Sequence, residues 1–334
     1  MAVDERRAAI LRAVVEGYIE TAQPVGSGQV ARAGSVNVSP ATIRNELSAL
    51  EADGYLVQPH TSAGRVPTDK GYRFFVDNLV APGPLDAGRR QQVSSFFASA
   101  HGAVEEMLRS TSQLLSQVTD YAAVVVAPPH EQATVRSIQL VSLGGRTVLV
   151  VAVLSNGGVE KASMELVDEI GEERLGAATV HLSGALVGSP LGELPPVSPS
   201  GDSQIDDLCD QARRAVTDEH SRETDQVYVG GASRMAEAFD AVQTVRQVLS
   251  TLEQQYVVVS LLRDVIDRGM TVAIGVEHGF EPLAECSIVV SPYEVEGEVA
   301  GTIGVLGPTR MHYPEALAAV AVVSQRLGRR LSEG

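Results

Sequence analysis

Apolar residues recur every three or four positions through the first part of the chain, which is the spacing of helices that bury one face. A β-prone run and a basic turn interrupt this pattern and are typical of a short hairpin. In order, the pattern predicts helices over 4–21, 27–33 and 40–53, a hairpin over 55–66 and a closing helix over 69–79. These elements are sufficient for an independent first domain, which we place at residues 1–80.

The helix predicted after Ser39 has two different faces. Ser39 can cap it, Pro40 fits its first turn, and Gly54 can end it in a left-handed conformation. One face is an apolar stripe made of Ile43, Leu47 and Leu50. The opposite face carries short polar side chains and an arginine: Thr42, Arg44, Asn45 and Ser48. Such side chains can contact base edges and phosphates in a major groove. A helix followed by a basic hairpin is typical of a winged helix; the alternative is a small αβ unit that only packs on its neighbours.

A second pattern follows a Pro/Gly-rich linker at 81–84. Apolar residues spaced alternately by four and three predict one long helix over 86–120 with a seam like that of a coiled coil. We expect the edge of this helix to be shared with a second subunit, although packing within one chain explains the seam equally well. The predicted dimer residues are Val93, Phe97, Ala100, Val104, Met107 and Leu114.

The rest of the chain alternates between strand and helix patterns. In order, it predicts strands over 122–126, 137–143 and 146–153 with a hairpin turn at Gly144-Gly145, helices over 163–186 and 205–220, a strand at 227–229, helices over 235–268 with a break near 254–256, strands over 272–276, 287–291 and 299–306, and a last helix to 331. Strands, a helical block and then more strands favour one α+β domain with an insertion. We place its parts at 81–167 and 239–334, and the inserted α+β domain at 168–238.

Charge is distributed unevenly along the chain. The net charge is −16. Residues 1–79 hold 8 Lys/Arg and 9 Asp/Glu, a net of −1, so the acidic excess lies outside the first domain. Salt screens charges over about 8 Å under physiological conditions, so a distant acidic domain hardly cancels a local basic patch. The composition therefore allows a nucleic-acid partner.

Two separated motifs carry a family resemblance. SPATIRNELSALEADGYLVQPHTSAGRVPTDKGYRFFVD, from Ser39 to Asp77, and GPTRMHY, from Gly307 to Tyr313, resemble the heat-inducible transcription repressor HrcA family. The resemblance implies an N-terminal winged helix-turn-helix followed by a GAF-like α+β domain that an inserted domain interrupts. It also implies a sequence-specific repressor of chaperone operons, which binds an inverted-repeat DNA operator as a homodimer and is modulated by temperature and by the chaperonin.

The expected DNA contacts fall into three groups. The polar face of the third helix would enter the groove, the turn of the hairpin would be the wing, and two cations of the closing helix would contact the backbone. The residues are Thr42, Arg44, Asn45 and Ser48, then His60, Thr61, Ser62, Gly64 and Arg65, then Lys70 and Arg73.

Chemistry of other kinds has little support in the sequence. No histidine pair or cysteine cluster has metal-ligand spacing, no nucleophile–base set is recognisable, and no cofactor is expected. The two cysteines and the lack of a long apolar run favour a cytoplasmic protein with no membrane segment. Three rival functions stay open: a regulator whose GAF-like domain senses a metabolite, an enzyme with a DNA-binding appendage, and a protein-interaction module. The apolar lining expected for a GAF-like pocket favours a filled core over a ligand site.

Overall fold

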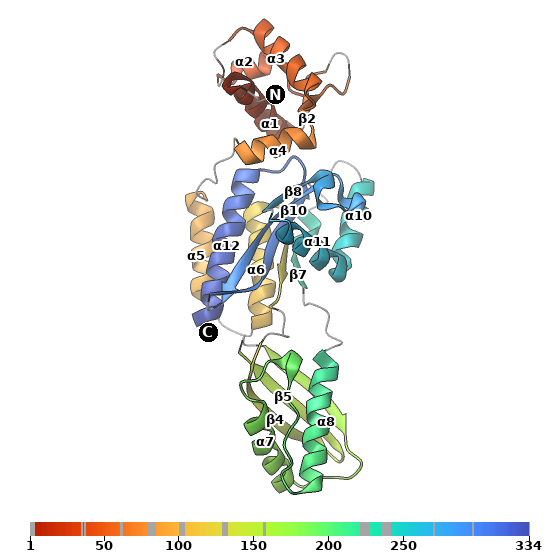
Figure 1. Ribbon diagram of the computed structural model, residues 1–334. Coiled ribbons are helices and arrows are strands. Elements are labelled where there is room, and N and C mark those ends of the chain that lie inside the picture. The colour runs from red at the N-terminus through yellow and green to blue at the C-terminus, as the bar shows by residue number, and fades with distance from the viewer. Residues whose placement is uncertain are drawn as a thin grey trace.

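Three structural units follow one another along the length of the computed structural model (Figure 1). The N-terminal unit lies at one end, a central unit carries the largest sheet, and a unit inserted into the central one lies at the other end. The structure describes residues 4–34, 36, 38–60, 63–78, 85–99, 104–128, 133–155, 158–220, 227–234, 242–269, 271–295 and 297–333. The mixed α+β class expected from the sequence is confirmed.

The N-terminal unit consists of helices around one small hairpin. Its elements are α1 (Glu5–Thr21), α2 (Ser27–Arg32), α3 (Pro40–Ala52), β1 (Leu56–Val57), β2 (Val66–Pro67) and α4 (Asp69–Asn78). Sequence-predicted caps are present: the Ser39 hydroxyl accepts a hydrogen bond from the backbone of Thr42, and Gly54 follows α3 with a φ of 78°. Thr68 likewise accepts from the backbone of Gly71 at the start of α4. Local capping chemistry therefore sets the boundaries of these helices.

The central unit is a five-stranded antiparallel sheet with helices on both faces. The strand order is β7-β3-β10-β9-β8, with bounds β3 (Ala122–Val126), β7 (Val227–Gly230), β8 (Val272–Ile274), β9 (Cys286–Val295) and β10 (Glu298–Pro308). Side chains alternate between the two faces, so Ala123 and Val125 share a core with α6 and α12, whereas Val124 and Val126 share another with α10 and α11. The helices are α5 (Ala87–Ser99), α6 (Val104–Thr119), α10 (Val242–Glu253), α11 (Gln255–Asp267) and α12 (Tyr313–Glu333), with short 3-10 turns η3 (Gly275–His278) and η4 (Glu281–Leu283).

The prediction of a single long helix over 86–120 is wrong. Two helices occupy this segment, and the side chains of Gln92 on α5 and Gln117 on α6 are 3.3 Å apart, as expected for an antiparallel pair. A seam cannot continue through such a reversal. The predicted dimer residues Val93, Phe97 and Leu114 are buried in the chain's own core, Val104 and Met107 pack against it, and Ala100 lies outside the described residues. The intramolecular alternative therefore explains the seam.

The inserted unit begins earlier than the predicted boundary at 168. Its three-stranded sheet, ordered β4-β5-β6, is separate from the central sheet. Its elements are β4 (Val135–Gly144), β5 (Thr147–Leu154), β6 (Val159–Glu165), α7 (Glu172–Leu186), the 3-10 turn η2 (Leu191–Glu193) and α8 (Ser203–His220). The unit has its own hydrophobic core, and β7 near 230 already belongs to the central sheet. Periodicity identified β4 and β5 as strands but missed β6, and it could not show which sheet they join.

Most other predicted elements are confirmed, with several differences. The hairpin predicted at Gly144-Gly145 is present between β4 and β5. Its turn lies between the paired residues Gly144 and Thr147, one residue later than expected. Strand β6 was not predicted, and its last residues, 163–165, fall in a predicted helix. The strand predicted over 272–276 ends at Ile274, where η3 begins. The break predicted near 254–256 separates α10 from α11. Among the helices that the structure describes, none combines the length and the apolar character needed to cross a bilayer.

Candidate nucleic-acid interface

Helix α3 presents a continuous exposed face to solvent. Its apolar stripe, Ile43, Leu47 and Leu50, is buried. The exposed positions follow the helical repeat on the other side: Ala41, Arg44, Asn45, Ser48 and Ala52. Three of the four polar residues predicted on this helix are therefore together on one exposed face. Thr42 is half-buried, and its hydroxyl lies 3.0 Å from that of Ser39, so it helps to start the helix.

An ion-pair cluster fastens α3 to α1. The buried carboxylate of Glu46 accepts hydrogen bonds from Arg6 at 2.5 Å and from Nε of Arg7 at 2.9 Å. The two arginines lie at the start of α1 and neutralise the only charged side chain on the inner face of α3. Sequence reasoning missed Glu46 because its partners lie some forty residues away. The consequence is a rigid support for the exposed face.

The hairpin is joined to a third extended segment. Val25 and Arg65 exchange backbone hydrogen bonds of 2.9 and 2.8 Å, which forms an isolated antiparallel bridge. A Cβ atom on Gly64 would lie 2.4 Å from the Val25 carbonyl carbon, so only glycine permits this approach. His60 is exposed at the turn, while Thr61 and Ser62 lie outside the described residues. Gly64 thus has a structural role in holding the turn.

Two cations expected to contact DNA make contacts within the chain, to α3 and its C-terminal end. The Arg65 side chain is only 14% exposed, and its Nε donates to the Glu51 carboxylate at 2.9 Å. The Lys70 ammonium donates to the Asp53 carbonyl at 2.7 Å and lies 4.4 Å above the Tyr55 ring. A cation near the last carbonyls of a helix is favourable. Both side chains therefore hold the hairpin and α4 against α3.

Arg73 connects the N-terminal unit to the central unit. Its guanidinium binds the Glu277 carboxylate through two nitrogens and donates to the Val272 carbonyl at 2.8 Å. The hydrogen bond with Glu277 is the main reason that the pKa of Arg73 is raised. Asp69, on the same helix, accepts a hydrogen bond from the Val276 backbone, and burial raises the pKa of its carboxyl. These contacts fix α4 on β8 and η3.

The four cations of the predicted interface differ in whether they have partners within the chain. Among the described residues, no hydrogen bond or ion pair occupies the Arg44 guanidinium, whereas Arg65, Lys70 and Arg73 are engaged within the chain. The exposed set consists of one fork-shaped cation, one amide and one hydroxyl, and the Ser48 hydroxyl also donates to the Arg44 carbonyl at 3.1 Å. An arginine and an amide can each make bidentate contacts to base edges.

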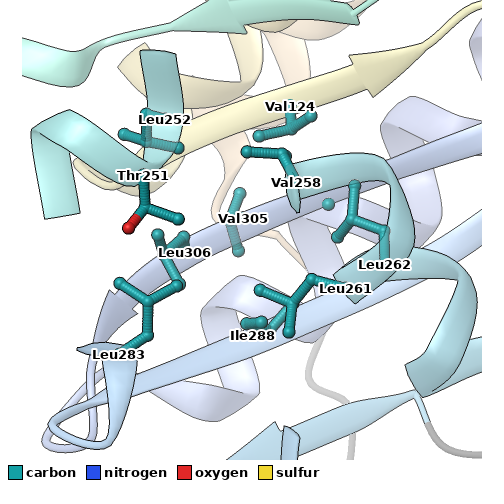
Figure 2. A pocket seen from close by; sticks show the side chains of 11 residues that line it. Val124, Thr251, Leu252, Val258, Leu261, Leu262, Leu283, Ile288, Val305 and Leu306 are labelled. Atoms are coloured by element: carbon teal, nitrogen blue, oxygen red, sulfur yellow. The ribbon is translucent and has the colours of Figure 1, made fainter. Parts of the chain in front are cut away.

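The central unit offers little room for a ligand between its sheet and α10 and α11. A cavity of about 10 Å³ lies there, which is about enough for one water molecule, and Figure 2 shows the side chains that line it. Its lining is apolar apart from Thr251, whose hydroxyl donates to the Gln247 carbonyl at 2.9 Å. Within the described residues, no group of three or more His, Cys, Asp or Glu could hold a metal ion. The apolar lining agrees with the filled core expected from the sequence.

Comparisons with known proteins agree with the motifs. The family model described as HrcA protein C terminal domain matches residues 105–317. Curated relatives named heat-inducible transcription repressor HrcA are 37% identical in Pseudarthrobacter chlorophenolicus, over 98% of this chain and 99% of the relative, and 39% identical in Mycobacteroides abscessus, over 98% of both. The names of these relatives also agree with the expectation that the chain is not an enzyme.

A crystal structure described as that of a hypothetical protein has the same fold. It covers 99% of both chains with a TM-score of 0.69 at 20% sequence identity. The sequence relatives extend over nearly the whole chain, and the family model covers more than half of it. The chain therefore belongs to the HrcA family of heat-inducible transcription repressors.

Proposed function

We propose that residues 4–78 are a winged helix-turn-helix that reads the major groove of an inverted-repeat operator. The observation that carries the proposal is the exposed face of α3, supported from behind by Glu46 and flanked by the hairpin. Helices α2 and α3 would be the helix-turn-helix, and the hairpin would be the wing. The GAF-like designation of the central unit is part of the same proposal and has its support in the family resemblance.

The individual residues have different roles in this proposal. Arg44, Asn45 and Ser48 contact base edges and phosphates, with Thr42 at the start of the same helix. The turn residues His60, Thr61 and Ser62 approach the adjacent backbone. Gly64, Arg65, Lys70 and Arg73 act by positioning these elements, since their contacts lie within the chain. Few phosphates are neutralised in this arrangement, so non-specific affinity should be modest.

The operators would precede chaperone and chaperonin genes, and the protein would act in the cytoplasm. The support is the heat-inducible repressor name shared by the relatives. Footprinting on the organism's own genome, at low and high temperature, tests this directly. Protection of palindromic sites upstream of chaperone genes at low temperature supports the proposal, and protection of unrelated sites would contradict it.

An inverted repeat requires two copies of the chain related by a two-fold axis. Because Val93, Phe97 and Leu114 of the predicted seam are buried within the chain, we place the contact between copies elsewhere. Helices α7 and α8 cover one face of the β4-β5-β6 sheet. The other face carries a central row of half-buried Leu149, Val151 and Val153, with Val141 and Val159 exposed beside it. The cross-strand neighbours of Val151 on this face are Gln139 and Lys161. We propose that two copies pair through this open face, with its apolar row at the contact.

Val151→Glu is expected to convert the dimer into a monomer, because it introduces a charge at the centre of the open face. Operator affinity should then fall by about a hundredfold or more, since two half-sites no longer bind one particle. Sedimentation with and without DNA measures the change. Val180→Glu, at a 75% exposed position on α7, is the matched control and should stay dimeric. A dimeric Val151→Glu variant, or a monomeric parent protein, would contradict this assignment.

Chaperonin dependence is proposed from the topology of the chain. The central sheet pairs β3 with β10 and β7, so strands separated by a whole inserted unit must meet before the core closes. Such long-range contacts form slowly and leave apolar surface exposed. Refolding of denatured protein with chaperonin should therefore yield several times more operator-binding activity than refolding alone. Equal yields under both conditions would argue against the chaperonin's role.

A further inference from the structure

A polar pocket of about 270 Å³ lies at the contact between the N-terminal and central units. One wall is Ile19 of α1, and the other walls come from three loops at one end of the central sheet. These loops lie side by side because Leu306 pairs with Ala122, and Ala123 with Gly230. The lining residues are Ile19, Asp120, Tyr121, Arg234, Pro308, Arg310 and His312.

Two glycines next to these loops permit close packing against Tyr121 and Ser116. A Cβ on Gly307 would lie 2.7 Å from the Tyr121 ring, and one on Gly231, whose φ is 69°, would overlap the Ser116 hydroxyl. The Tyr121 hydroxyl accepts a hydrogen bond of 2.9 Å from the His312 backbone. Burial raises the pKa of Tyr121, and its hydroxyl, which is protonated at neutral pH, can donate a hydrogen bond to an occupant. The GPTRMHY motif and the Gly230-Gly231 turn thus meet at one site.

The pocket is cationic in a strongly acidic protein. Two arginines line it against one carboxylate, that of Asp120, which is paired with Arg234. Asp120 has a φ of 62°, a conformation uncommon for residues other than glycine. Helix α12 begins directly after His312, and the positive end of its dipole adds to the local potential. The nearby Glu315 carboxylate is bound by Arg89. The lining therefore carries one more cationic than anionic side chain.

We propose that this pocket binds a small organic phosphate. Guanidinium groups match phosphate oxygens with two parallel hydrogen bonds, and the Tyr121 hydroxyl supplies a further donor. Ile19, Pro308 and the Tyr121 ring offer an apolar wall to the organic part, and the volume lies near the lower end for small-ligand sites. Because Ile19 belongs to the DNA-reading unit, an occupant touches both units and favours the arrangement that holds them together.

Calorimetric titration of the full chain with inorganic phosphate, and with AMP against adenosine, tests the site without DNA, so its outcome is independent of operator binding. We expect one saturable phosphate site per chain, tighter binding of AMP, and none of adenosine. Arg310→Gln should weaken both by about tenfold or more, because a charge-assisted contact is lost. Arg146→Gln, in an exposed pair on the inserted unit, is the matched control and should bind normally.

Thermal unfolding shows whether each variant keeps its fold. If Arg310→Gln does not fold, the comparison is made with Arg234→Gln, at the other lining arginine, for which we expect a loss of about threefold or more. Absence of saturable binding up to about 10 mM would overturn the proposal. Equal affinity in the pocket variant and in Arg146→Gln would overturn it as well.

Discussion

Arg44→Glu is expected to lower operator affinity by about a hundredfold while leaving the free energy of unfolding nearly unchanged. Arg44 is exposed on the face of α3 that carries Asn45 and Ser48, and its guanidinium has no partner among the described residues. A bidentate arginine contact to a base contributes about 1–3 kcal/mol of discrimination. Reversal of the charge also adds repulsion from the phosphates, so the effect should approach the upper end of that range.

The matched control is Arg329→Glu, which makes the same change of charge at an exposed position near the end of α12. That helix end lies far from α3 along the molecule (Figure 1). Shift assays and thermal unfolding of both variants separate a contact effect from a folding effect. Equal operator affinities in the two variants would place α3 outside the interface.

Gly64→Ala is expected to impair the wing through the backbone and not through a lost DNA contact. The new methyl group would lie 2.4 Å from the Val25 carbonyl carbon, so the Val25–Arg65 bridge must open or shift. Overpacking of this kind costs about 1–3 kcal/mol of unfolding free energy. Because Arg65 moves with the hairpin, its ion pair with Glu51 on α3 should weaken too, and operator affinity should fall by about tenfold or more.

Gly28→Ala is the appropriate control, since Gly28 lies in α2 and a Cβ there meets nothing within 4 Å. Alanine is the better helix former, so this variant should gain up to about 1 kcal/mol of stability. Thermal unfolding of the two variants side by side provides the measurement. Gly64→Ala protein as stable as the Gly28→Ala protein would show that the bridge contributes little.

Local chemistry made much of the N-terminal unit predictable. Ser39, Pro40 and Gly54 mark the ends of α3 by capping rules that depend on a few adjacent residues. The buried stripe of α3 follows in the same way from helical periodicity. The exposed positions of Arg44, Asn45 and Ser48 were therefore accessible from the sequence.

Long-range pairing was not predictable by the same means. Arg65, Arg73 and Lys70 are cations near a basic turn, and nothing in the sequence shows that Glu51, Glu277 and the Asp53 carbonyl bind them. Their engagement depends on tertiary contacts, one of which spans about two hundred residues. The inserted unit presents the same difficulty, because alternation identifies β4 and β5 as strands, misses β6, and leaves their sheet undetermined.

The exposed face of α3, presented by two copies of the chain, is the central feature of the proposed function. The most direct test is the affinity of the full-length protein for a palindromic chaperone-promoter fragment and for a random duplex of equal length, at 0.15 M salt. We expect a preference of about a thousandfold or more for the palindrome, as is usual for specific binding. Equal affinity for the two duplexes would contradict the account.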